Sequence, residues 1–106
     1  IGDLGADVVK VEKPLEGDDT RSWGPPFLAD SNESAYYLSC NRNKRSLALD
    51  FTTDTGKATL CALATKADVL LENYKVGTLA KYGLDYASLS TLNPRLVYCS
   101  LTGFGQ

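Results

Sequence analysis

Histidine and methionine are absent from this 106-residue sequence, and tryptophan occurs once. The lack of histidine excludes a Ser–His or Cys–His nucleophilic pair within the chain. The three cysteines, Cys40, Cys61 and Cys99, are far apart and form no C-x-x-C spacing. A metal site and a disulfide framework are therefore not expected, and we interpret the cysteines as free thiols of a reducing, intracellular compartment.

The sequence also lacks a long apolar run and a strong charge of either sign. No segment approaches the roughly 18–20 consecutive apolar residues that a membrane-spanning helix needs. The formal net charge of −2 creates no general attraction to nucleic acid or to anionic membranes. With 43% hydrophobic and 23% charged residues, the composition is that of an ordinary globular protein. We therefore expect neither a nucleic-acid nor a membrane partner.

Short apolar segments alternate with helical patterns along the chain. Gly5 is predicted to end a helical turn in the left-handed conformation. Residues 14–34, rich in Pro, Gly, Asp, Asn and Ser, are predicted to be a loop, and a loop of this length usually has a function or belongs to an interface. Strands are predicted at 6–12, 46–51, 68–72 and 96–101, and helices at 35–40, 55–66, 76–82 and 85–92.

This order of elements predicts an α/β fold. The strands are too apolar to be buried on one face only, which favours a partial Rossmann-like, mostly parallel sheet with helices on both faces. Thr53 or Asp54 is predicted to cap the helix at 55–66, and Asp85 the helix at 85–92. The chain starts like the last turn of a helix and stops in a loop after a strand. We therefore expect it to be a fragment of a larger fold.

Polar or aromatic residues follow each predicted strand. Ligands of open α/β sheets bind beyond the carboxyl ends of the strands, where Lys13 would offer a cation and Tyr74 a flat ring. Glu12, also at a strand end, resembles the acidic residue that holds a ribose in dinucleotide-binding folds. The G-x-G-x-x-G motif that should precede it is absent. The strand ends alone leave ligand binding open, because ordinary polar turns produce the same pattern.

Two charged clusters have both a functional and a structural interpretation. Asp18 and Asp19 precede Arg21, and we interpret them as a solvated turn with local ion pairs rather than as an acid/base or metal site. The basic run from Arg42 to Arg45 could bind a phosphate through charge-assisted hydrogen bonds. It could equally be a solvated surface.

Several stretches, in order and with matching spacing, resemble one family. They are Gly2–Glu12, Gly17–Arg21, Trp23–Phe27, Asn41–Ser46 with Leu49-Asp50, Ala67–Asn73, Tyr82–Leu84, Leu92–Arg95 and Gly103–Gln106. Together they are similar to the family III coenzyme A (CoA) transferases, the group typified by formyl-CoA and carnitine-CoA transferases. The second and third stretches resemble the branch that uses succinyl-CoA and dicarboxylic acids such as glutarate or hydroxymethylglutarate. The resemblance implies that residues 1–106 are a fragment of the CoA-binding large domain.

The resemblance also implies where CoA would bind. Tyr74 stands where the family often has Phe, and an aromatic ring there can stack on the adenine. Lys13 and Lys81 stand where Arg is common, so they would face phosphates without the bidentate fork of a guanidinium. The full set of implied contacts is Lys13, Leu49, Asp50, Phe51, Thr52, Asn73, Tyr74, Lys75 and Lys81.

The family's chemistry uses an aspartate as covalent nucleophile. This carboxylate attacks the acyl-CoA thioester and forms a mixed anhydride. It then becomes an aspartyl-CoA thioester, which the acceptor acid resolves. The aspartate is expected beyond Gln106, so no catalytic residue is assigned here. The resemblance implies no covalently bound cofactor, because acyl-CoA and a carboxylic acid are the substrates.

Three alternatives stay open. A 2-methylacyl-CoA racemase shares the fold, but it would need a His/Asp base pair beyond Gln106, and the stretches Gly17–Arg21 and Trp23–Phe27 favour the transferase. A truncated, non-catalytic fragment would bind CoA weakly or not at all. A dinucleotide-binding module is disfavoured by the missing glycine motif. The resemblance further implies an interlaced homodimer for the full-length parent and a mitochondrial or cytoplasmic location.

Overall fold

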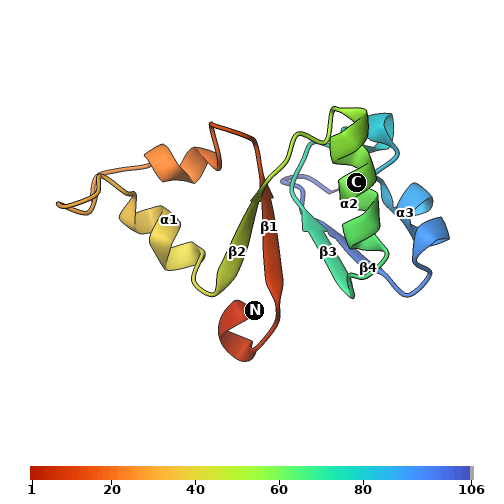
Figure 1. Ribbon diagram of the computed structural model, residues 1–106, viewed down its shortest axis with the longest axis horizontal. Coiled ribbons are helices and arrows are strands. Elements are labelled where there is room, and N and C mark those ends of the chain that lie inside the picture. Colours follow the sequence, from red (N-terminus) through yellow and green to blue (C-terminus); the bar gives the residue numbers. More distant parts are fainter. Residues whose placement is uncertain (106) are drawn as a thin grey trace. The chain divides into compact units, whose positions relative to one another are not determined.

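The structure, a computed structural model, describes residues 1–105 and consists of two compact units (Figure 1). Unit 1 is Ile1–Asp50 and unit 2 is Phe51–Gln106. Each unit contains one two-stranded parallel sheet. The last residue of the Gly103–Gln106 stretch lies outside the described residues.

In unit 1, the loop and helix that connect the two strands lie on one side of the sheet (Figure 1). Strand β1 (Val8–Glu12) pairs in parallel with β2 (Lys44–Ala48), so that Glu12 lies opposite Ala48. The connection contains a 3₁₀ helix, η2 (Asp19–Ser22), and the α-helix α1 (Ala35–Cys40). Side-chain oxygens of Asp18 and Ser34 cap these two helices by accepting hydrogen bonds from backbone N–H groups.

The structure confirms the predicted helix at 35–40 and corrects the position of the second strand. β2 begins at Lys44, two residues before the predicted start, and ends at Ala48 rather than at residue 51. Asn43 has a φ of 55°, a left-handed conformation that Asn tolerates well, and it turns the chain directly into the strand. Lys44 and Arg45 have exposed side chains. Charge therefore did not prevent them from joining the sheet.

In unit 2, strand β3 (Val69–Glu72) pairs in parallel with β4 (Val97–Ser100). The helices are α2 (Asp54–Ala64), the 3₁₀ helix η3 (Leu79–Tyr82) and α3 (Tyr86–Leu92). Thr53 caps α2 as predicted, its Oγ1 accepting from the backbone N of Gly56 at 3.0 Å. The helix predicted at 76–82 is only the short η3, because Gly77 adopts a φ of 79° and interrupts the helical path.

The apolar core of unit 2 lies between its helices and one face of its sheet. Ala64, Leu84, Leu89 and Leu96 are buried, and Leu70 of β3 and Tyr98 of β4 pack against them. The opposite face of β3 and β4 carries Val69, Leu71 and Val97, each more than half exposed.

These observations confirm the α/β class and the parallel pairing and correct two details. The strands form two sheets of two strands each rather than one sheet. In unit 2 the helices cover one sheet face rather than both, because the described elements are too few to cover the second face. None of the helices within residues 1–105 is long and apolar enough to cross a membrane.

Candidate functional site

Lys13 and Leu49 are the first residues past the carboxyl ends of the paired strands β1 and β2. The backbone N of Leu49 donates to the carbonyl of Glu12 at 2.9 Å, which continues the pairing by one residue past β2. The side chain of Lys13 is 68% exposed, and its Nζ lies 3.5 Å from a carboxylate oxygen of Glu16, whose side chain is also exposed. An exposed ion pair of this kind holds a side chain only weakly. The ammonium of Lys13 is thus accessible to a ligand at this sheet end.

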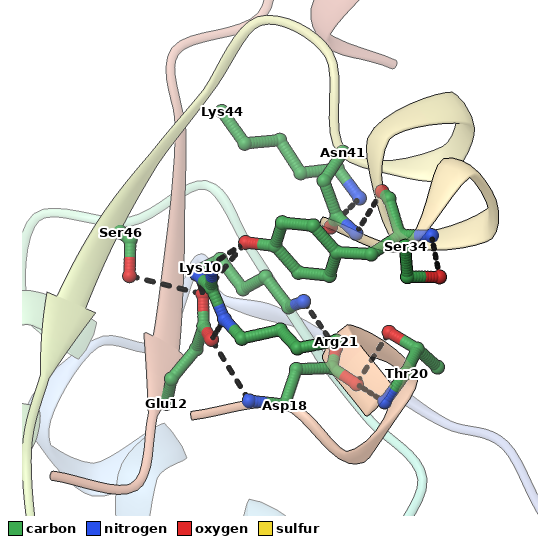
Figure 2. A network of polar contacts seen from close by, with 10 residues as sticks. Lys10, Glu12, Asp18, Thr20, Arg21, Ser34, Asn41, Lys44 and Ser46 are labelled. Atoms are coloured by element: carbon green, nitrogen blue, oxygen red, sulfur yellow. Dashed lines mark hydrogen bonds and ion pairs between the residues drawn. The ribbon is translucent and has the colours of Figure 1, made fainter. Parts of the chain in front are cut away.

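Glu12, directly before Lys13, has a buried carboxylate that lies at the centre of a partly buried polar network (Figure 2). Its carboxylate accepts from Arg21 Nε at 2.9 Å and Nη2 at 3.1 Å. It also accepts from Tyr37 Oη at 3.1 Å, from Ser46 Oγ at 2.9 Å and from the backbone N of Asp18 at 2.9 Å. These partners occupy the carboxylate within the protein. This geometry favours a structural role for Glu12 over that of a ribose ligand.

A second ion pair extends this network. Lys10 Nζ binds the carboxylate of Asp18, whose other oxygen accepts from Thr20 N at 2.7 Å. Lys10 and Arg21 also lie over the ring of Tyr37, at 4.6 and 4.1 Å from its centroid. We call Lys10, Glu12, Asp18, Arg21, Tyr37 and Ser46 the Glu12 cluster. The Asp–Asp–Thr–Arg segment thus forms ion pairs as predicted, but its partners Lys10 and Glu12 lie on β1 rather than within the turn.

The Glu12 cluster lowers the pKa of both of its carboxyl groups. The hydrogen bonds from Arg21 oppose the effect of burial and, with those from Ser46 and Tyr37, lower the pKa of Glu12 to about 2. Burial alone would raise the pKa of Asp18, but the ammonium of Lys10 and the bonds from Thr20 lower it to about 2. Both groups are therefore ionised at neutral pH.

The polar interior of unit 1 contrasts with the apolar core of unit 2. Within Ile1–Asp50, the buried residues are Glu12 and Ser34, both polar. The sequence contained one signal of this arrangement. Lys10 and Glu12 are two residues apart on a strand, so their side chains point to the same face. The network could not be predicted, because Tyr37 and Ser46, which donate to Glu12, lie far from it in the sequence.

The basic run from Arg42 to Arg45 engages carboxylates of its own unit. Arg42 pairs with Asp3, and Arg45 Nη2 lies 2.8 and 2.7 Å from the two carboxylate oxygens of Asp7. This geometry favours the structural interpretation of the run over phosphate binding.

In unit 2, three aromatic rings gather near the carboxyl end of β3. Phe51 contacts Tyr74 edge-on, with centroids 5.6 Å apart, and Tyr82 at 5.5 Å. The backbone N of Tyr74 donates to Glu72 Oε2 at 2.7 Å, which fixes the turn after the strand. Tyr74 is 42% exposed. Its ring is therefore held on one side by Phe51 and is partly open to solvent.

An open hollow of about 560 Å³ lies beside this turn. Its lining includes Lys75, Glu72, Asp85, Tyr86 and Tyr98. Burial, together with the carboxylates of Glu72 and Asp85, raises the pKa of Tyr98 to about 12. The neutral phenol donates to the carbonyl of Leu84 at 3.2 Å. With two carboxylates and one ammonium on its wall, the hollow suits a neutral polar group better than a phosphate.

The implied CoA contacts divide between the two units. Lys13, Leu49 and Asp50 belong to unit 1, whereas Phe51, Thr52, Asn73, Tyr74, Lys75 and Lys81 belong to unit 2. Within the units, Leu49 bonds the carbonyl of Glu12, the residue before Lys13, and Phe51 contacts Tyr74. In residues 1–105, no group of three or more His, Cys, Asp or Glu side chains is placed to hold a metal ion.

Known proteins resemble this chain over its whole length. It is 54% identical to a succinate–glutarate CoA-transferase of Agrobacterium fabrum, and the match covers 100% of the chain and 28% of that protein. It is 50% identical to the human succinyl-CoA:glutarate CoA-transferase, with 100% of the chain and 24% of that protein covered. The chain thus spans about a quarter of the length of these relatives.

The solved structures agree with these relatives. A CAIB/BAIF family protein from Brucella suis matches with a TM-score of 0.90 and 57% identity, over 97% of this chain and 28% of that one. A Mycobacterium tuberculosis protein matches with a TM-score of 0.89 and 40% identity, over 97% of this chain and 28% of that one. The family model described as CoA-transferase family III matches residues 1–106. With its whole length matched, the chain belongs to CoA-transferase family III.

Proposed function

We propose that the full-length protein transfers CoA from succinyl-CoA to a dicarboxylic acid of the glutarate class. The observation that carries this proposal is the identity of 54% and 50%, across the whole chain, to two relatives named for succinate or succinyl-CoA and glutarate. A third relative, of Haloarcula hispanica, is 48% identical and is named succinyl-CoA:mesaconate CoA-transferase. The names of the human and Haloarcula relatives thus share succinyl-CoA as the donor and differ in the acceptor.

In the proposed reaction, an aspartate outside this chain attacks the thioester carbonyl of succinyl-CoA. The C–S bond breaks, CoA leaves as a thiolate, and a mixed anhydride forms. The thiolate then attacks the aspartyl carbonyl, which releases succinate and leaves an aspartyl-CoA thioester. The acceptor carboxylate repeats these two steps in reverse and departs as the new acyl-CoA. Covalent catalysis divides one hard acyl transfer into easier ones, without a metal, an oxidant or water.

This chain would supply part of the CoA site. Lys13 at the end of β1 and Lys81 in η3 have exposed side chains that would face the phosphates. The ring of Tyr74, held by Phe51, would stack on the adenine. Asn73 and Lys75 are the neighbours of Tyr74 in the sequence, and residues 49–52 follow β2. Those four are Leu49, Asp50, Phe51 and Thr52.

Replacing Tyr74 with alanine is expected to weaken CoA binding by about 5- to 150-fold, since stacking of a base on an aromatic ring contributes about 1–3 kcal/mol. The measurement is the dissociation constant of CoA by calorimetry on the full-length protein. Tyr74→Phe is the control, because it keeps the ring, and it should bind within about twofold of the wild type. Equal affinity of all three proteins would remove Tyr74 from the adenine site.

The activity itself is tested by incubating the full-length protein with succinyl-CoA and a panel of dicarboxylic acids. Mass spectrometry should show a new acyl-CoA formed in equal amount with free succinate. No exchange, but deuterium uptake at C2 of a 2-methyl-branched acyl-CoA, would establish the racemase instead. Absence of both reactions, and of CoA binding, would support a non-catalytic product.

Assembly and location are part of the same proposal. We expect the full-length protein to be an interlaced homodimer. Light scattering after size-exclusion chromatography would then give twice the mass of one full-length polypeptide. A mitochondrial or cytoplasmic site fits the free thiols of Cys40, Cys61 and Cys99. Cell fractionation with an antibody against the full-length protein distinguishes the two locations.

A further inference from the structure

We infer that Glu12 is a positioning residue for acyl-CoA binding: its carboxylate clamps the loop of residues 13–21 so that Lys13 is held at the carboxyl end of β1. This inference rests on the proposed function, in which Lys13 faces a CoA phosphate. Glu12 itself touches no substrate in this scheme, because its oxygens are occupied by Arg21, Tyr37, Ser46 and the backbone of Asp18.

The first step of the argument is the opposite orientation of two neighbouring side chains. Successive side chains of a strand point to opposite faces. The side chain of Glu12 is 3% exposed, turned into the Glu12 cluster, whereas that of Lys13 is 68% exposed. Fixing Glu12 therefore fixes the backbone that presents the ammonium of Lys13 to solvent.

The second step is the close contact of the loop with the Glu12–Arg21 pair. The loop closes on itself where Gly17 N donates to the carbonyl of Lys13 at 3.0 Å. A Cβ added at Gly17 would lie 2.8 Å from both Cδ and Nε of Arg21 and 3.1 Å from Glu12 Oε2. The turn that follows Lys13 thus rests directly on the ion pair, and only glycine fits there. Its φ of 71° also favours glycine.

The third step is that polar contacts, rather than buried apolar side chains, anchor this loop. In unit 1, all of whose residues are described, no hydrophobic side chain is buried. The loop residues Pro14, Leu15 and Glu16 are exposed. Two polar contacts within the Glu12 cluster hold the loop from the other end: the bond of Asp18 N to Glu12 and the ion pair of Asp18 with Lys10. Loss of the Glu12 charge should therefore loosen the loop.

The test compares Glu12→Gln with Glu33→Gln in the full-length protein. Glutamine keeps the size of the side chain but cannot accept from every donor that surrounds Glu12. Glu33, an exposed residue of the same unit, is the matched control. Trypsin cleavage after Arg21, followed by mass spectrometry, should be at least about tenfold faster in Glu12→Gln, and unchanged in the control.

The kinetic readout distinguishes positioning from general destabilisation. Glu12→Gln should raise the KM for succinyl-CoA by about five- to tenfold at nearly unchanged kcat, as expected when ground-state binding is lost. If Glu12 acts through Lys13, adding Glu12→Gln to Lys13→Gln should raise KM little further, because the two effects then do not add. Additive effects, or an unchanged KM in Glu12→Gln, would overturn the inference.

A milder variant keeps the test valid if Glu12→Gln does not fold. Tyr37→Phe removes one donor to Glu12 and one acceptor for Arg21 while the ring stays in place. Its cleavage rate and KM should change in the same direction as in Glu12→Gln but by a smaller factor. An unchanged cleavage rate would contradict the inference that Glu12 holds the loop. If the wild type neither binds nor converts acyl-CoA, the proposed function fails together with the role of Glu12 in binding. The cleavage rates would then still report whether Glu12 holds the loop.

Discussion

Replacing Leu89 with alanine is expected to lower the free energy of unfolding by about 2–5 kcal/mol. Leu89 is the 0% exposed residue of α3 and lies in the cluster formed with Ala64, Leu84 and Leu96. Truncation removes apolar surface from the core and leaves a cavity, and a cluster of four buried residues has few neighbours to fill it. The measurement is chemical unfolding of the full-length protein, followed by far-ultraviolet circular dichroism.

Leu92 on the same helix provides the control. It is 49% exposed at the end of α3, so Leu92→Ala removes the same atoms from the same helix but loses little burial. It should change the unfolding free energy by less than about 1 kcal/mol. Equal losses in both variants would mean that the apolar cluster is not the core of unit 2.

Lowering the pH from 4.5 to 2 is expected to remove the contribution that ionised Glu12 makes to stability. The pKa of Glu12 is lowered on folding, from 4.5 to about 2. The contribution is therefore complete above the unfolded value and disappears as the pH falls through the folded value. For the buried Glu12 this difference corresponds to about 3 kcal/mol. Asp18, with a pKa lowered from 3.8 to about 2, acts in the same direction.

The pH effect is isolated by comparing the wild type with Glu12→Gln. Unfolding midpoints of both full-length proteins are measured between neutral pH and pH 2. The advantage of the wild type should be constant above the unfolded pKa of Glu12 and should shrink steadily below it, because glutamine does not titrate. Glu33→Gln, which alters an exposed carboxylate, should follow the wild type. A constant difference between wild type and Glu12→Gln at all pH values would contradict the lowered pKa.

The exposed apolar face of β3 and β4 is a reason to study the full-length protein. Val69, Leu71 and Val97 are 55%, 58% and 60% exposed, although parallel sheets are normally covered on both faces. The family relatives are about four times longer, since the chain covers 24–28% of them. Stability and activity are therefore best measured on the full-length protein.

Local chemistry made much of the secondary structure predictable. The cap at Thr53, the left-handed Gly5 and the end of α3 before Asn93 all depend on contacts between near neighbours. The start of β2 was missed, because a basic run looks like a surface loop until its pairing with Val8–Glu12 is known. The break at Gly77 was missed as well, since an isolated glycine only weakly disfavours a helix.

For the candidate site, single residues could be predicted and their arrangement could not. Lys13 and Tyr74 follow strands, so a position at a sheet end could be expected for both. The Glu12 cluster joins residues up to 34 positions apart. No periodicity in the sequence links Glu12 to Tyr37 or Ser46. Their meeting depends on the parallel register of β1 and β2 and on the return of α1 to the sheet.

The sequence by itself determined the family, the α/β class, the Thr53 cap of α2 and the strand-end position of Lys13 and Tyr74, because each depends on residue order or on neighbours within one turn. The predicted cap at Asp85 was wrong, because Asp85 stands at the N-cap position of α3 without a side-chain hydrogen bond to the helix backbone. The tertiary structure alone decided that Glu12 is a structural anchor rather than a ribose ligand. It also decided that Arg42 and Arg45 pair with carboxylates, and that the strands form two sheets. The physical reason is the same in each case: a charged group acquires its role from the partners that folding places within hydrogen-bond distance, and those partners are far away in the sequence.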